Sequence, residues 1–305
     1  MNKNTQYLLA GALGLVVMVV GFNSIKDSFN ESMYGTVVKP VMEKYFLSPA
    51  PVTEHGREVD QMIVYIHLLM LVLFIGWTAY FLIALWRFRK SRNAKADYAG
   101  VTSKVPTTLA EYGVIAAEVV LIGCFAVPLW GKAVNPETMQ GDDIVNVDII
   151  SEQFMWNAVY PGPDGKFGKR DPDRSSQGNK FGILREGAGL DDISIENARE
   201  KDNPLVFPFD QKVVMRITSR DVIHSLKVLP LRVCQDAIPG LEIGQHFTVN
   251  DKSAIGKKYL ITCAQLCGDG HATMRGYVEI RSRKDFEQWV SDQSAKVAES
   301  LKPKE

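Results

Sequence analysis

The sequence predicts a membrane-spanning α-helical hairpin followed by an all-β domain. Two long apolar runs lie in the first half of the chain, whereas short β-branched and aromatic runs separated by turn residues fill much of the second half. The 35 basic and 35 acidic side chains balance to a formal charge of zero. This balance argues against a nucleic-acid-binding protein, and no nucleic acid is expected as a partner.

The first apolar run, Met62 to Trp86, contains no charged residue and would reach about 37 Å as a helix, against a hydrocarbon core of about 30 Å. The second run, Leu109 to Trp130, is interrupted only by Glu111 and Glu118. A shorter run, Leu8 to Phe22, fits either a third span or a cleaved signal peptide. We therefore predict two or three spans in a lipid bilayer.

The loop between the two long runs is strongly basic. It contains one acidic residue, Asp97, and six basic ones: Arg87, Arg89, Lys90, Arg92, Lys95 and Lys104. Because basic loops stay in the cytoplasm, the chain after Trp130 is predicted to lie on the extracytoplasmic side. We expect a multi-pass protein of a bacterial plasma (inner) membrane with its β domain in the periplasm.

Four regions follow from these patterns. Residues 1–61 hold the short apolar run and an external connector in which prolines 40, 49 and 51 are expected to break any long helix, and 62–131 hold the hairpin. Residues 132–282 form the extracytoplasmic domain, with a polar surface insertion at about 161–208. Residues 283–305 space their apolar side chains as an amphipathic helix.

Five strands are predicted in the third region from their β-branched and aromatic content. They are Ile144 to Ile150, Val213 to Thr218, His246 to Val249, Tyr259 to Thr262 and Gly276 to Ile280. Short strands without helical periodicity are typical of a sandwich or a barrel.

A cluster of soft metal ligands lies within residues 263–274: Cys263, Cys267, His271 and Met274. Thiolate and thioether sulfur suit Cu(I), imidazole suits both copper states, and a set of His, Cys and weakly bound Met is typical of electron-transfer copper sites. Two cysteines four residues apart can bridge a pair of copper ions, each of which needs one imidazole. A disulfide or a zinc site are the alternatives, but neither uses Met274.

The second imidazole must come from another part of the chain. His224 is the best of the remaining histidines because it follows a strand whose end can lie beside the 263–274 loop. His55 lies in the connector, His67 in a span, and His246 in a strand whose alternation can face it outward. The sequence Cys-x-x-Cys-His is absent, so no covalently attached haem is expected.

Three segments together resemble the second subunit of cytochrome c oxidase. They are residues 221–225 (DVIHS), 236–240 (DAIPG) and 263–274, and with the two preceding spans the resemblance covers roughly residues 60–282. The resemblance implies a cupredoxin-like Greek-key barrel holding a binuclear Cu(A) centre. In that centre, Cys263 and Cys267 would bridge the coppers, His224 and His271 would be terminal ligands, Met274 a weak axial ligand, and the Gln265 carbonyl would lie opposite Met274.

The resemblance also implies a function. The chain would pass electrons from a c-type cytochrome or membrane-bound donor, through Cu(A), to haem in the catalytic subunit I of a haem-copper terminal oxidase that reduces oxygen to water. Other oxidase subunits would be further partners, and this chain would contain no catalytic residue for the oxygen chemistry. The alternatives are the Cu(A) subunit of a nitric oxide reductase and a membrane-tethered copper-delivery protein.

Three further positions are interpreted through the resemblance. The family commonly has Glu where this chain has Gln265, and because a neutral amide is a weaker ligand for a hard cation, this departure weakens the expectation of magnesium at the subunit boundary. Phe154 stands where the family has the Trp at which electrons enter, and Trp156 follows two residues later. Glu111 has the spacing of the family's glutamate at the mouth of a proton channel.

Overall fold

The structure is a computed structural model that describes residues 31–92, 95, 98, 103, 105–141, 143–176, 179–198 and 202–302. The short run Leu8 to Phe22 and the loop residues Asp97 and Lys104 lie outside the described residues. Two compact units make up the described chain. The first contains the residues up to Leu47 together with Glu58–Gly131, and the second contains Ser48–Arg57 together with the residues from Lys132 onward.

Both long apolar runs are helical, as predicted. The first forms α4 (Glu54–Arg87), and the second forms α5 (Val105–Leu121), one π-helical turn η2 (Ile122–Ala126) and α6 (Val127–Val134). Glu54–Arg87 and Thr107–Val134 have mean hydropathies of 2.4 and 2.1 and are long and apolar enough to cross a membrane. Their apolar side chains are almost entirely unburied within this chain, which a surrounding bilayer or neighbouring subunits would explain.

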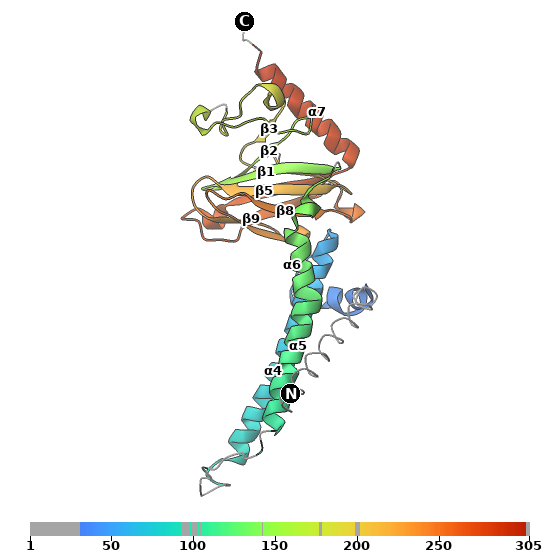
Figure 1. Cartoon of the computed structure of the whole chain (residues 1–305), viewed down its shortest axis with the longest axis vertical. Coiled ribbons are helices and arrows are strands. Elements are labelled where there is room, and N and C mark those ends of the chain that lie inside the picture. Colours follow the sequence, from blue (N-terminus) through green and yellow to red (C-terminus); the bar gives the residue numbers. More distant parts are fainter. Residues whose placement is uncertain are drawn as a thin grey trace, which may run out of the picture. The chain divides into compact units, whose positions relative to one another are not determined.

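A further helical segment in the first unit precedes α4. The π-helical turn η1 (Tyr34–Val38) continues into α3 (Lys39–Tyr45), and this blue segment crosses the α4–α5 pair (Figure 1). An apolar cluster joins the three elements: Val38, Met42, Val64, Tyr65, Leu121 and Phe125. Pro40 lies within the first two positions of α3, directly after the π-helical turn, and the helical segment continues through it, so the expected break does not occur there.

The second unit is built from two five-stranded sheets. In spatial order, the first sheet contains β3 (Ile193–Ile195), β2 (Met155–Tyr160), β1 (Ile144–Glu152), β5 (Lys212–Ser219) and β8 (Ile243–Thr248). The second contains β4 (Leu205–Pro208), β10 (Arg275–Arg281), β9 (Lys258–Cys263), β6 (His224–Val228) and β7 (Val233–Ala237). The predicted fold class, membrane helices plus an all-β domain, is therefore confirmed.

The core of this unit lies between the two sheets. Figure 1 shows the strands of the first sheet one above another in the order β3, β2, β1, β5 and β8. Alternate residues of β5, such as Val213 and Ile217, are fully buried there, and the rings of Phe207 on β4 and Phe247 on β8 meet edge to face at 5.3 Å. Helix α7 (Arg283–Ser300) follows β10 and adds Phe286 and Trp289 to the same core. One apolar core thus joins the two sheets and α7.

Two segments outside the predicted strands also belong to this unit. Within Ser48–Arg57, Thr53 forms a β-bridge with Val249, and the Val52 N–H group donates to the Pro230 carbonyl at 2.9 Å. The segment 161–208 is not only a surface insertion, because it contains β3 and β4. Its Phe181 and Ile183 cover residues of β1 and β2 on the outer face of the first sheet.

Candidate metal centre

The pairing of β6 with β9 brings the predicted ligands together. His224 begins β6 and Cys263 ends β9, and the two strands are antiparallel, with Leu226 opposite Cys263. The Ala264 N–H group donates to the Ser225 carbonyl at 3.0 Å, which fixes the first residue of the loop that follows. His224 and Cys263 are 39 positions apart in the chain, so the sheet ladder supplies the proximity.

All six predicted ligand residues lie in one cluster around the two cysteine sulfurs. The Sγ atoms of Cys263 and Cys267 are 3.8 Å apart. Cys263 Sγ is 3.9 Å from His224 Nδ1 and 3.1 Å from the Gln265 carbonyl oxygen. Cys267 Sγ is 3.6 Å from His271 Nδ1 and 3.7 Å from Met274 Sδ.

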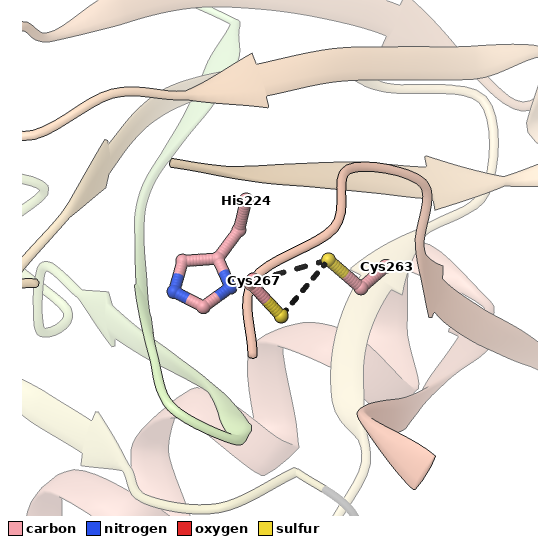
Figure 2. Close-up of side chains that lie close together, drawn as sticks. All are labelled: His224, Cys263 and Cys267. Carbon is pink, nitrogen blue, oxygen red and sulfur yellow. Dashed lines mark hydrogen bonds between the residues drawn. The ribbon is translucent and has the colours of Figure 1, made fainter. Parts of the chain in front are cut away.

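Figure 2 shows His224, Cys263 and Cys267 directed toward one another. Among the described residues these three form a group able to hold a metal ion, with ligand atoms within 4.8 Å of one another. The sulfurs are too far apart for a disulfide, whose bond length is about 2 Å. The 263–274 loop is closed at its base by the Cys263 N–H group, which donates to the Met274 carbonyl at 3.3 Å.

The inner side of the cluster is dry. His224 has no exposed surface, and Cys267 and Met274 are buried, whereas Gln265 and Leu266 are exposed. Burial, followed by the neighbouring Cys263 thiol, raises the pKa of Cys267 to about 12. The buried Cys267 thiol therefore keeps its proton unless a cation compensates the thiolate charge, which is the situation in a metal site.

Asp221 fixes the orientation of the His224 ring. Its Oδ1 lies 2.8 Å from His224 Nε2, and because a carboxylate only accepts hydrogen bonds, Nε2 carries the proton. The lone pair is then on Nδ1, the nitrogen that faces Cys263. Burial alone would raise the pKa of Asp221, but hydrogen bonds from the Gln153 N–H, His224 and the Val222 N–H outweigh burial and lower it.

The turn between β1 and β2, in the first sheet, is hydrogen-bonded to the 263–274 loop of the second sheet, which is called the metal loop below. Gln153 Nε2 donates to the Cys267 carbonyl at 2.7 Å, and the Gln153 N–H group donates to Asp221 Oδ2 at 2.6 Å. One residue therefore connects the two parts of the site. The sequence reasoning gave Gln153 no role, because a glutamine carries no signal of chemistry until its neighbours in space are known.

Two loop glycines lie against side chains of the β1–β2 turn. A Cβ atom on Gly270 would lie 2.3 Å from Phe154 Cδ2, and one on Gly268 would lie 2.8 Å from Gln153 Nε2 and 3.2 Å from Phe154 Cζ. Gly268 also has φ +129°, a conformation that L side chains rarely adopt. The sequence reasoning missed both glycines, although the Gly-x-Gly spacing between two ligands was a readable signal.

The remaining predicted site residues are placed as follows. Phe154 is half-buried beside the loop, whereas Trp156 has no exposed surface and its ring centroid lies 6.2 Å from that of His224. Trp156 is therefore an inner residue that a donor on the surface does not touch. Glu111 is exposed on α5 in the first unit. Its role, like those of Phe154 and Trp156, stays a prediction.

Comparison with known proteins bears directly on this site. Residues 186–280, which include all six predicted ligand residues, match the family model for the periplasmic domain of cytochrome c oxidase subunit II. Over these residues the chain is similar to the cytochrome c oxidase subunit II family. Within this family, the alternative cytochrome c oxidase subunit 2 of Bradyrhizobium diazoefficiens is 30% identical over 152 residues, which cover 50% of this chain.

This chain spans about half (52%) of that relative's length. The cytochrome c oxidase subunit 2 of Cereibacter sphaeroides is 27% identical over 252 residues, covering 80% of this chain and 77% of the relative. Among solved structures, the periplasmic domain of cytochrome oxidase subunit II of Bradyrhizobium japonicum matches 52% of this chain and 99% of that domain, with 24% identity and a TM-score of 0.36.

Proposed function

We propose that this chain is a member of the cytochrome c oxidase subunit II family, accepts electrons for a haem-copper terminal oxidase and holds a binuclear Cu(A) centre. One observation carries the proposal: two thiols 3.8 Å apart each have an imidazole nitrogen within reach, His224 for Cys263 and His271 for Cys267. A pair of metal ions bridged by both sulfurs would thus receive one imidazole each.

The other donors also suit copper. Met274 contributes a thioether and Gln265 a backbone carbonyl, and this soft set is the one that copper electron-transfer sites use, whereas zinc has no use for a thioether. Copper bound there would supply reversible one-electron chemistry. The residues of the chain hold the donors in place: Asp221 fixes the His224 ring, and Gln153 fixes the loop at Cys267. Rigid donors favour transfer with little rearrangement.

The surroundings support a route for electrons. Phe154 packs against the loop at the protein surface, and Trp156 lies inside it, beside His224. We propose that electrons enter at Phe154 from a c-type cytochrome or membrane-bound donor and leave toward haem in catalytic subunit I. Glu111 is proposed to lie at the mouth of a proton channel formed with that subunit. Magnesium binding through Gln265 would depend on ligands from the neighbouring subunit.

The names of the relatives favour an oxidase over the two alternatives, a nitric oxide reductase subunit and a copper-delivery protein, because they are cytochrome c oxidase subunits. Purifying the intact chain with its partner subunits tests this choice. We expect a haem-containing subunit to co-purify and the complex to consume oxygen with reduced c-type cytochrome as donor.

Electron paramagnetic resonance of the copper-loaded chain tests the centre itself. One unpaired electron shared equally by two copper nuclei gives the hyperfine pattern of two equivalent nuclei, and we expect this pattern to disappear in Cys267→Ser. Cys234→Ser is the matched control, because Cys234 is exposed on β7 and is expected to leave the pattern unchanged. A single-nucleus pattern in the unaltered chain, or a shared pattern that survives in Cys267→Ser, contradicts the proposal.

A further inference from the structure

The helical segment before the first span ends in an exposed apolar tip. Tyr45, Phe46 and Leu47 follow one another at the end of α3 and are 70%, 38% and 83% exposed. Such a run of large apolar side chains at a helix end is unfavourable in water. The tip lies in the same compact unit as the two long apolar helices, so its level relative to them is defined.

That level is inside the apolar part of the first span. The ring of Phe46 meets the ring of His67 edge to face at 4.8 Å, and His67 lies five residues into the uncharged stretch that starts at Met62. At about 1.5 Å per residue, Phe46 is therefore about 7 Å beyond the start of this stretch. The segment's buried face agrees, because Val38 and Met42 pack against Val64 of α4.

The backbone of Leu47 points to a use for its side chain. Leu47 has φ +49° and is the residue after the C-cap of α3, a position usually held by Gly or Asn because a Cβ atom is unfavourable there. A leucine in this strained conformation with an exposed side chain gains no contact within the described unit that would explain it. Contact with an apolar environment outside the chain would explain why a leucine stands at this position.

Lysines accompany the tip. Lys39 and Lys44 are exposed on the same short helix, and Lys44 Nζ lies 5.2 Å from the centre of the Tyr45 ring. Lysine and tyrosine together are typical of a membrane interface, where the ammonium reaches the phosphates while the ring and methylene groups stay in the apolar layer. Lysine is depleted in interfaces between proteins, so this composition favours lipid as the neighbour.

We propose that residues 34–47 form a helix lying in the extracytoplasmic membrane interface, with Tyr45, Phe46 and Leu47 inserted among phospholipid chains. Through the Phe46–His67 contact, the tip continues the apolar surface that α4 exposes at residues such as Leu68 and Leu71. The inserted tip would hold the connector against the membrane at the level where the first span begins. This proposal does not depend on the metal centre.

Photo-crosslinking in the assembled oxidase complex tests the proposal directly. Two variants are prepared, Tyr45→p-benzoylphenylalanine and Leu47→p-benzoylphenylalanine. Each is assembled into the complex, and the complex is reconstituted into phosphatidylcholine nanodiscs and irradiated. The mass of this chain is then measured. We expect the mass of one phospholipid to be added at both positions. Leu190→p-benzoylphenylalanine is the control, because Leu190 is a 50% exposed leucine in the β unit and is expected to give severalfold less lipid adduct.

Two results would overturn the proposal. One is a crosslink from positions 45 and 47 to another polypeptide, which would mean that a neighbouring subunit covers the tip. The other is a yield of lipid adduct no greater than that of the control. The Tyr45 variant extends an aromatic ring that is already exposed, so it carries the test even where the Leu47 variant does not assemble.

Discussion

The contact between Phe154 and Gly270 leads to a prediction about how the metal loop is held. Gly270 has φ −87° and ψ 4°, a conformation that residues with a Cβ atom adopt at the third position of type I turns, so Gly270→Ala adds a methyl group at a negative φ. That methyl carbon would lie 2.3, 2.4 and 2.7 Å from Cδ2, Cγ and Cε2 of Phe154, although carbon atoms in contact are about 3.5–4.0 Å apart. Either the ring or the loop must move.

The magnitude follows from this overlap. Adding a methyl group to a packed site costs about 1–3 kcal/mol, and overlap with three ring atoms places Gly270→Ala at about 2–3 kcal/mol. A loop displaced by the ring no longer presents Cys267 and His271 together, so copper affinity is expected to fall about 30- to 150-fold. Phe154→Ala removes the ring, and the double variant is expected to recover about 2 kcal/mol as coupling energy.

Competition with a copper chelator on the purified full chain measures these affinities, and the hyperfine pattern reports whether the centre is intact. Gly268→Ala is the control, because its backbone at φ +129° stays strained whether or not the ring is present. Phe154→Ala should therefore rescue Gly270→Ala but not Gly268→Ala. Unchanged affinity in Gly270→Ala, or equal rescue of both glycine variants, would refute the reasoning.

Three further perturbations have expected outcomes. Gln153→Ala leaves the Cys267 carbonyl without its 2.7 Å donor and should lower the free energy of unfolding in urea by about 1 kcal/mol. Trp289→Ala should lower the free energy of unfolding by about 3–5 kcal/mol, because Trp289 is only 8% exposed and its ring centroid lies 5.1 Å from that of Tyr160. Burial raises the pKa of Asp192 from 3.8 to about 6, so the folded protein binds a proton that the unfolded chain releases. Stability should therefore rise as pH falls from about 6 to about 4, and Asp192→Asn should remove this pH dependence between those values.

Each of these outcomes has a matched comparison. Trp289→Phe keeps most of the apolar ring and should cost clearly less than Trp289→Ala in the same urea titration. Gln153→Glu keeps the length of the side chain but replaces the amide donor with a carboxylate that faces the Cys267 carbonyl oxygen, so it should cost at least as much as Gln153→Ala. An Asp192→Asn variant whose stability follows the pH dependence of the unaltered chain between pH 4 and pH 6 would show that this carboxyl is not the group responsible.

The parts of the fold that the sequence predicts are those with one buried face or one long apolar run. β5 places Val213, Met215 and Ile217 on one fully buried face, and the two long apolar helices are long and apolar enough to cross a membrane. β2 was missed because all but one of its residues are buried, which removes the alternation. Its second face is covered by Phe181 and Ile183 from a polar segment that looks like a surface insertion when the sequence is considered alone.

The same distinction applies to the site. Cysteine, histidine and methionine at fixed offsets indicate a site for a soft metal, so the candidate ligands could be predicted from the sequence. The pairing of β6 with β9 explains why His224 lies beside them. The residues that hold these ligands in place were not predictable from the sequence. Gln153 acts through hydrogen bonds to Asp221 and to the Cys267 carbonyl, which are 68 and 114 positions away in the chain. The roles of such residues depend on which strands become neighbours, which no local pattern encodes.

The hydrogen bonds between the β1–β2 turn and the 263–274 loop bear on the proposed route of electrons. Phe154 is the covalent neighbour of Gln153, which is bonded both to the loop at Cys267 and to the carboxylate that steers His224. The Phe154 ring and the ligand atoms beside it are therefore expected to move together. If electrons enter at Phe154, as proposed above, this connection would keep the distance from the ring to the ligands constant while donors dock in different orientations.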